Sequence, residues 1–136
     1  REGDWLYNNS PIKNTKLVKL FSSVLRNDNG SYFLVTPYEK VPVFSELAPY
    51  VITNFDISDN IITLHTNLDY SFPLNDQNTT RLVKYQNTII PLVHVRNGID
   101  GFFNRATYYK LVDLALEENI IINTFYLKNY FLVLLF

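Results

Sequence analysis

The residues best suited to binding chemistry surround an Arg-Asn-Gly sequence at positions 96–98. Arg96 ends an apolar, β-branched run, and we expect a helix to start between Gly98 and Gly101. A guanidinium group donates paired hydrogen bonds in a fixed planar geometry, and the start of a helix adds unpaired backbone N–H donors. Both suit a phosphate or a carboxylate. Arg96, Asn97, Gly98 and Arg105 are therefore candidate ligands of an anion. The alternative is that both arginines form ordinary salt bridges with acidic residues elsewhere in the chain.

A second group of candidates follows a predicted strand, where Thr36, Glu39 and Lys40 place a hydroxyl, a carboxylate and an ammonium within five residues. The alternative is a solvated turn in which Pro37 only ends the strand. Arg26 is expected at the C-terminus of the first helix, where the helix dipole explains it, and it is a further candidate for the anion cluster.

Charge is unevenly distributed along the 136 residues, although the formal net charge is only -1. Residues 46–78 carry five acidic side chains and no Lys or Arg, whereas residues 79–110 carry five basic side chains and only Asp100. This asymmetry favours an anion site in the second region. Because the chain has no overall basic field, we expect no nucleic-acid partner.

Several kinds of chemistry are excluded by composition. The absence of Cys excludes disulfide scaffolds and thiol catalysis, and the two His residues have no partner at metal-ligand spacing, so we expect no metal and no cofactor. Ser22 and Ser23 have no evident base, and four Gly without a close triplet provide no phosphate-binding loop. Nucleophilic catalysis therefore has no support in the sequence. His94 shares a strand face with Arg96 and either lines the same pocket or is a half-buried sheet residue.

Hydrophobic periodicity predicts an α+β fold with two helices. Asn8 and Asn9 predict a tight hairpin, and a helix from Thr15 to near Arg26 is capped by Asn14 or Thr15. A second helix is predicted over residues 101–118, capped by Asp100. Strands are predicted at residues 31–36, 41–44, 50–56, 60–66, 70–72, 81–85, 89–96, 120–126 and 130–136. Most aromatic residues are expected in the core, with Trp5 and Tyr38 as candidates for stacking.

The order strand, helix, strand, strand occurs at both ends of the chain, and residues 16–20 resemble residues 110–114. These features indicate two related halves, unless two amphipathic helices are alike by chance. We predict an N-terminal subdomain of hairpin, helix and strands over residues 1–45 and a C-terminal sheet with one long helix over residues 46–136. The apolar run 130–136 is too short to cross a bilayer as a helix, so we expect no membrane partner. The absence of Cys fits a reducing compartment, and we expect a cytoplasmic protein.

The sequence resembles a bacterial family, the domain-of-unknown-function family 1285, over most of its length. The resemblance is carried by Gly3-Asp4-Trp5, Ser10-Pro11-Ile12, Leu17-Val18-Lys19-Leu20-Phe21, Tyr32-Phe33-Leu34-Val35-Thr36-Pro37, Val95-Arg96-Asn97-Gly98-Ile99 and Asn104-Arg105-Ala106. The chain departs from the family pattern at residues 129–136, which are almost purely apolar, and at Asp100-Gly101.

The resemblance implies two related halves, the second superficially similar to pleckstrin-homology domains. It also implies a cleft between the halves that binds a nucleotide-like ligand, a signalling role and no catalytic activity. We therefore expect a ligand-sensing module. The alternative is a protein–protein interaction module that presents a sheet edge or groove and needs no small molecule. A third candidate, a hydrolase, requires a metal held by carboxylates such as Asp56, Asp59 and Asp69.

Overall fold

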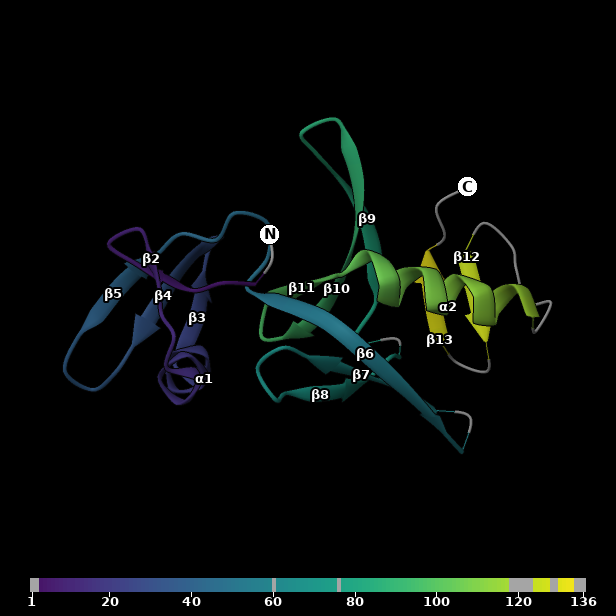
Figure 1. Ribbon diagram of the computed structural model, residues 1–136, viewed down its shortest axis with the longest axis horizontal. Helices are drawn as coiled ribbons and strands as arrows, with labels where there is room; N and C mark the ends of the chain where they lie inside the picture. The colour runs from purple at the N-terminus through teal and green to yellow at the C-terminus, as the bar shows by residue number, and fades with distance from the viewer. Residues whose placement is uncertain (1–2, 60, 76, 118–123, 128–129, 134–136) are drawn as a thin grey trace.

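The computed structural model describes residues 3–59, 61–75, 77–117, 124–127 and 130–133. Two strand-rich parts follow one another along the chain (Figure 1). The first contains β1 (Leu6–Tyr7), β2 (Ser10–Pro11), α1 (Thr15–Ser23), β3 (Leu25–Asp28), β4 (Ser31–Val35) and β5 (Lys40–Val43). Strands β3, β4 and β5 form an antiparallel sheet in that order.

The predicted N-terminal hairpin and helix start are confirmed. Strands β1 and β2 pair across Asn8 and Asn9, whose φ angles of 51° and 66° are the left-handed values that a tight hairpin turn requires. Asn14 is the N-cap of α1, because its side-chain oxygen accepts the Leu17 N–H at 3.2 Å.

The predicted end of the first helix is wrong. Helix α1 ends at Ser23, and Leu25 begins a strand whose register with β4 places Leu25 opposite Leu34. The reason is the Asn29-Gly30 turn, with φ angles of 55° and 92°, which folds residues 25–28 back onto β4 as a hairpin. Arg26 therefore lies in a strand and not at a helix C-terminus.

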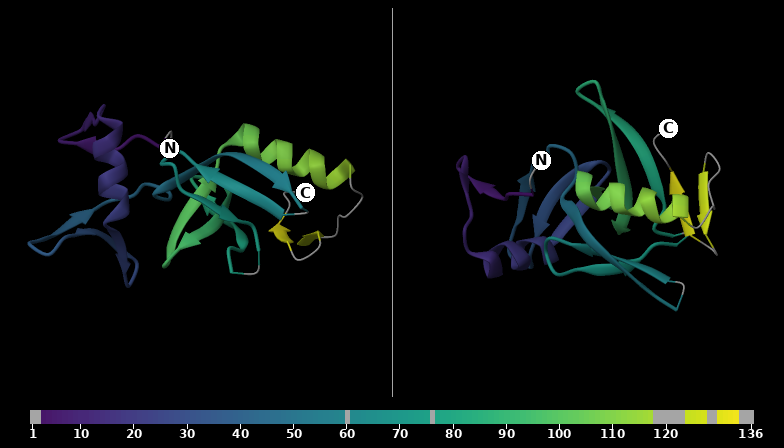
Figure 2. Two further views of the ribbon diagram at one scale, coloured as in Figure 1. Left: turned by 90° about the horizontal axis from the view of Figure 1, so that it is seen from below. Right: turned by 45° about the vertical axis from the view of Figure 1, so that its right-hand side comes forward.

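The second part is a curled six-stranded sheet in the order β8-β7-β6-β11-β10-β9 (Figures 1 and 2). All neighbours are antiparallel except β11 and β6, which are parallel. The predicted strands of this region are confirmed with small shifts in their ends. The strands are β6 (Tyr50–Ser58), β7 (Ile61–Thr66), β8 (Ser71–Pro73), β9 (Thr80–Tyr85), β10 (Thr88–Arg96) and β11 (Ile99–Phe103).

The predicted start of the second helix is also wrong. Asp100 and Gly101 lie within β11, and α2 spans Arg105–Glu117, with the Asn104 side chain accepting the Thr107 N–H at 2.9 Å. Asn97 and Gly98, with φ angles of 48° and 75°, form the hairpin turn between β10 and β11. The helical spacing from Tyr108 to Leu116 lies within α2 and that part of the prediction is confirmed, whereas the predicted cap at Asp100 lies in a central strand.

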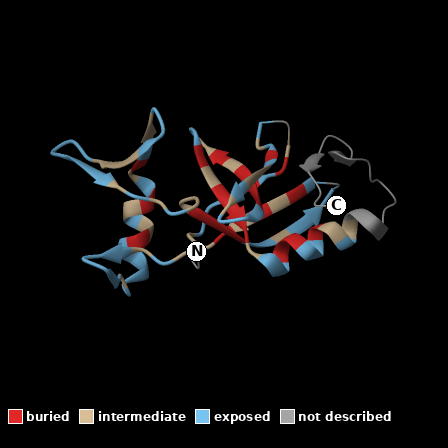
Figure 3. Ribbon diagram, turned by 90° about the horizontal axis from the view of Figure 1, so that it is seen from above, coloured by how far each residue is buried: buried red, intermediate tan, exposed pale blue. Residues whose placement is uncertain are grey.

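Most of the hydrophobic core lies in the second part, in two clusters on opposite faces of the sheet, and Leu25 of the first part joins the larger one. Most of the buried positions in Figure 3 are accordingly in the second part. On one face, Tyr108 and Leu111 of α2 pack in the larger cluster with sheet residues that include Ile52, Leu64 and Val93. On the other face, a smaller cluster comprises Val51, Ile90, Leu92 and Phe102, with Leu47 and Tyr85 packed against it. Alternation along β6, β10 and β11 produces this division, because successive side chains point to opposite faces.

The mixed α+β class is confirmed. The relation between the halves, the likeness to pleckstrin-homology domains and the division at residue 45 stay predictions. Strands β12 (Thr124–Leu127) and β13 (Tyr130–Val133) pair antiparallel within the two predicted closing strands, and the other residues of those predicted strands lie outside the described ones. In the described chain, neither helix is long and apolar enough to cross a membrane.

Gly101 provides a direct test of the β11 assignment. A Cβ atom at this position would lie 3.1 Å from Tyr50 Cβ and 3.2 Å from both Ile52 Cδ1 and Val95 Cγ2. We expect Gly101→Ala to lower the free energy of unfolding by about 1–3 kcal/mol in a urea titration, because the core is overpacked. If residue 101 began a helix, the same change would raise it by up to about 1 kcal/mol, and that result would contradict the strand.

Candidate functional site

A small pocket of about 450 Å³ lies where the first part meets the turn between β10 and β11. Its walls come from the end of α1, the start of β3 and the end of β4 on one side, and from Arg96 and Asn97 on the other. The lining residues are Ser23, Val24, Leu25, Arg26, Asn27, Val35, Arg96 and Asn97. Three predicted anion ligands, Arg26, Arg96 and Asn97, are thus brought together.

Arg96 is half-buried and fixed by two uncharged partners. Its Nε donates to the Tyr50 hydroxyl at 3.1 Å and its Nη2 donates to the Ser22 carbonyl at 2.8 Å. The guanidinium carbon lies 5.9 Å from the centre of the Tyr50 ring. Within the described part of the chain, no carboxylate lies in ion-pair range of Arg96, so the alternative of a salt bridge does not describe it there.

The Asn97-Gly98 turn is held by side chains from both parts. The Gly98 N–H donates to His94 Nε2 at 3.0 Å, and the Gly98 carbonyl accepts from Asn27 Nδ2 at 2.7 Å. His94 Nδ1 lies 3.2 Å from the Gln77 carbonyl, so these contacts assign the neutral ring with its proton on Nδ1. The Gly98 N–H is therefore used inside the turn. The expected helix start beside Arg96 does not exist, and His94 supports the turn.

Arg26 and Lys40 share one carboxylate on the outer face of the small sheet. Arg26 donates from Nε and Nη2 to the two oxygens of Asp28, both at 2.9 Å, and Lys40 Nζ lies 2.7 Å from Asp28 Oδ2. Lys40 also lies over the Phe33 ring, 4.2 Å from its centre. Two cations beside one acid leave this face positive, close to the mouth of the pocket.

The remaining predicted ligands do not line the pocket. Thr36 Oγ1 accepts the N–H groups of Tyr38 and Glu39 at 3.3 and 3.2 Å, so Thr36 and Glu39 build the turn between β4 and β5. Arg105 is exposed at the first residue of α2. Its separation from Arg96 follows from the strand between them, which the sequence analysis took for helix.

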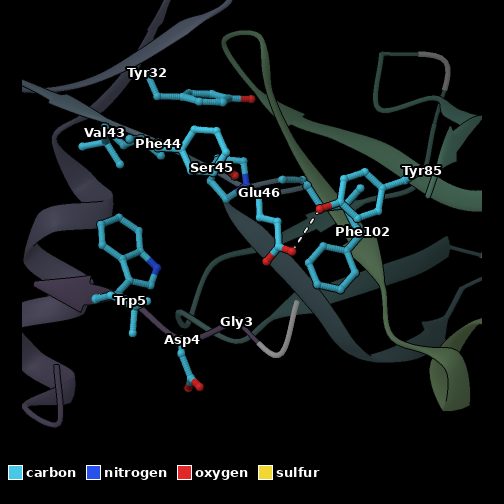
Figure 4. Close-up of a pocket in the computed structure, with 15 residues that line it drawn as sticks. Gly3, Asp4, Trp5, Tyr32, Val43, Phe44, Ser45, Glu46, Tyr85 and Phe102 are labelled. Atoms are coloured by element: carbon cyan, nitrogen blue, oxygen red, sulfur yellow. Dashed lines mark hydrogen bonds between the residues drawn. The ribbon is translucent and has the colours of Figure 1, made fainter. Parts of the chain in front are cut away.

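A larger cavity of about 890 Å³ lies beyond Leu25, which lines both pockets (Figure 4). It is bounded by the N-terminal segment, by the connection between β5 and β6, and by Tyr85 and Phe102 on the outer face of the large sheet. Trp5, Tyr32, Phe44, Tyr85 and Phe102 supply aromatic rings, and Asp4 and Glu46 supply carboxylates. Sequence analysis singled out only Trp5, because aromatic residues in a sequence do not show which of them border a cavity.

A chain of polar side chains on three neighbouring strands was also missed. His65 lies between Ser71 Oγ, 2.7 Å from Nδ1, and Asp56 Oδ2, 2.5 Å from Nε2. All three project from adjacent strands, so pairing distances alone bring them together. None of them lines either pocket, and the described residues contain no group of three His, Cys, Asp or Glu that could hold a metal.

Comparison with known families accounts for both parts of the chain. Residues 1–48 match the N-terminal domain of a domain of unknown function, DUF1285, and residues 49–128 match the C-terminal domain of the same family. The protein belongs to the DUF1285 family. The predicted resemblance is therefore confirmed. No curated protein matches the chain.

Two solved DUF1285 structures are similar to this protein. A family member from Silicibacter pomeroyi is 28% identical, with a TM-score of 0.87 over 99% of this chain and 76% of that one. A second, from Shewanella baltica, is 28% identical, with a TM-score of 0.67 over 82% of this chain and 85% of that one. This DUF1285 protein thus shares its fold with these two family members.

The pH dependence of the Arg26–Asp28–Lys40 group follows from its charges. Hydrogen bonds from Arg26, and then from Lys40, lower the pKa of Asp28 to about 2. Because the pKa is near 3.9 in an unfolded chain, the stabilisation is complete above about pH 5 and is lost as the pH falls through 2.

We expect an NMR titration of the Asp28 carboxyl to give a midpoint near 2, and the Lys40→Gln variant to give a higher one. The stability difference between the native protein and Asp28→Asn should be constant above about pH 5 and disappear as the pH falls through 2. A midpoint near 3.9 would show that neither cation pairs with Asp28 in solution.

Proposed function

We propose that this DUF1285 protein is a non-enzymatic sensor that binds a small anionic ligand between its two parts, at the pocket around Arg96. The observation that carries the proposal is the environment of the Arg96 guanidinium. It is half-buried and held in one orientation by Tyr50 and Ser22, yet no described carboxylate neutralises it. A partly desolvated cation with no counter-ion among the described residues favours an anionic ligand.

Arg26 supplies a second cation from the other side of the same pocket. Its ion pair with Asp28 lies at the surface, where water and salt screen the charges and such pairs are weak. A phosphate or carboxylate group in the pocket can therefore compete with Asp28 for Arg26 at small cost. The amide of Asn97, on the pocket wall, adds a hydrogen-bond donor. This set suits the phosphate portion of a nucleotide-like ligand.

A ligand held in this way would report on how the two parts sit together. Arg26 belongs to the small sheet and Arg96 to the large one, so one anion bridges them. Binding then favours the arrangement in which both arginines face the pocket, as any ligand favours the state that it binds more tightly. That coupling supports the proposed sensing and signalling role.

The test is isothermal titration calorimetry with AMP, cyclic dinucleotides and inorganic phosphate. We expect at least one of them to bind, and Arg26→Gln to weaken it about tenfold, a change of about 1.4 kcal/mol. Arg96→Lys should also weaken binding. A single ammonium group cannot keep the contacts with Tyr50 and Ser22 and also present the planar pair of N–H donors that a guanidinium offers to an anion. The matched control is Arg105→Gln, which removes an exposed cation outside the pocket.

Arg96→Lys also alters contacts between the two parts, so its thermal stability must be measured without ligand. Arg26→Gln is the deciding variant, because the Arg26 side chain is exposed and we expect its replacement to leave the fold intact. If Arg26→Gln and Arg105→Gln weakened anion binding equally, the loss would reflect the overall charge of the protein and not the pocket. That result would reject the pocket as the binding site. Failure of every anion to bind, even weakly, would reject the proposed function.

The second candidate function is a protein-interaction module, and one surface favours it. Strand β5 is an edge of the small sheet, and the aromatic side chains before and after it, Tyr38 and Phe44, are 96% and 89% exposed. An open edge flanked by exposed rings is suited to pairing with a strand of another chain. If this edge pairs with the same edge of a second copy, we expect light scattering to detect self-association of the native protein. The Val41→Lys variant should then be monomeric. A native protein that stays monomeric at high concentration would exclude self-pairing.

A further inference from the structure

We propose that His94 is a positioning residue of the anion pocket, which holds the Asn97-Gly98 turn only while its ring is neutral. Protonation of the ring releases the turn and weakens anion binding. The effect on binding rests on the proposed function, because Asn97 lines the pocket with Arg96, whereas the described lining does not include His94. The release of the turn is a property of the protein without ligand and is tested separately.

The hydrogen bonds of the His94 ring require one neutral form. Nε2 accepts the Gly98 N–H at 3.0 Å, and a ring nitrogen accepts only while it carries no proton. Nδ1 lies 3.2 Å from the Gln77 carbonyl, which can only accept, so the single ring proton is on Nδ1. A second proton, on Nε2, makes both ring nitrogens donors. The Gly98 N–H then faces another N–H and loses its acceptor.

The ring is one of two side chains that fix this turn. The other is Asn27 of the small sheet, whose Nδ2 donates to the Gly98 carbonyl at 2.7 Å. Asn97 and Gly98 are exposed, and the pairing of β10 with β11 shifts register between His94 and Arg96. Without the ring contact the turn has fewer constraints. Its release displaces Asn97 from the pocket wall and loosens the connection to Asn27.

The strand that carries His94 is held by contacts that do not involve the ring. The His94 N–H donates to the Thr79 carbonyl at 3.1 Å, and Asn78 Nδ2 donates to the carbonyls of His94 and Val95 at 2.9 and 3.0 Å. The Val95 side chain is buried in the core. Protonation therefore changes the turn and leaves the sheet in place, which is a local opening and not unfolding of the protein.

Charged groups on the strands around His94 do not replace the lost contact. These groups are Arg26 and Asp28 on β3, Arg81 on β9, Arg96 on β10 and Asp100 on β11. Asp100 is opposite His94 in the register, but its carboxylate is paired with Arg81, and Arg26 is paired with Asp28. Among the residues that the structure describes, no carboxylate lies in ion-pair range of the His94 ring. A protonated ring therefore has no described counter-ion.

His65, the other histidine of the chain, has a different environment and serves as an internal control. Its Nε2 lies 2.5 Å from Asp56 Oδ2, and its Nδ1 lies 2.7 Å from Ser71 Oγ. Both oxygens accept hydrogen bonds, so a protonated His65 keeps both partners. Protonation thus breaks a contact at His94 and breaks none at His65.

The first experiment follows the full chain without ligand by NMR between pH 5 and 8, the range in which histidine changes charge. We expect the Gly98 amide proton to shift with the same midpoint as the His94 ring, and the Asn27 side-chain amide to shift with it. The Thr107 amide, which donates to Asn104 Oδ1, is the reference and should stay constant. In His94→Gln, whose amide oxygen accepts the Gly98 N–H at every pH, neither signal should titrate. A Gly98 amide that stays constant while His94 titrates, or a His94 ring that does not titrate in this range, would overturn the switch.

The second experiment measures binding of cyclic di-AMP by calorimetry at pH 5.5 and 7.5, because its phosphodiester charges are constant between these values. We expect the native protein to bind at least threefold more weakly at pH 5.5, and His94→Gln to bind equally at both. The matched control His65→Gln should behave like the native protein. Asp76→Asn should do so too; Asp76 precedes Gln77 in the sequence and lies outside the described residues.

The direction of the change distinguishes release of the turn from a simple charge effect. A positive charge on His94 that left the turn intact would strengthen anion binding at pH 5.5, and that result would overturn the proposal. Equal loss of affinity in His94→Gln and the native protein would also overturn it. If cyclic di-AMP binds at neither pH, the proposed function fails for this ligand, whereas the Gly98 amide still decides whether His94 controls the turn.

Discussion

The parallel pairing of β11 with β6 is the constraint on which the rest of this structure depends. It joins two antiparallel hairpin systems into one six-stranded sheet, with Gly101 opposite Tyr50 at the point of closest approach. Because β11 is central, its two faces must both be covered. Helix α2 covers one face, and the smaller apolar cluster at the aromatic cavity covers the other. The same strand fixes the turn at Asn97 and Gly98, and thereby the position of Arg96.

Arg96 connects this sheet to the N-terminal part through hydrogen bonds to Tyr50 and to the Ser22 carbonyl. Asn27 makes a second connection through the Gly98 carbonyl, and Lys19 forms an ion pair with Asp69. The junction also contains apolar contacts, because Leu25 belongs to the large core cluster and Trp5, Tyr32 and Leu34 pack against it. Both pockets border this junction, and Leu25 lines each of them.

The two pockets differ in the chemistry of their walls although they share Leu25. One is lined by Arg26, Arg96 and Asn97 among others, and the other by five aromatic and two acidic residues. The charge asymmetry of the sequence corresponds to these two pockets. Arg96, from the basic region, lines one pocket, and Glu46, the first residue of the acidic region, lines the other. Arg26 and Asp28 are two residues apart on one face of β3 and form an ion pair there. The division of the sequence into an acidic and a basic region does not predict this pair.

Local sequence signals determined the hairpins, the cap of α1, most strands and the family. Asn-rich turns and Asn caps act through their own backbone and nearest neighbours, so they can be recognised in the sequence. Arg26, Arg96 and Asn97 were also identified as binding candidates, because guanidinium and amide groups retain their chemistry in any fold. Only the tertiary structure decided that residues 99–103 form a strand, since that depends on pairing with a segment some fifty residues earlier in the chain. The tertiary structure likewise decided which aromatic rings border a cavity and which candidate cations lie near one another. Both depend on pairing between segments that are distant in the sequence, which local patterns do not reveal.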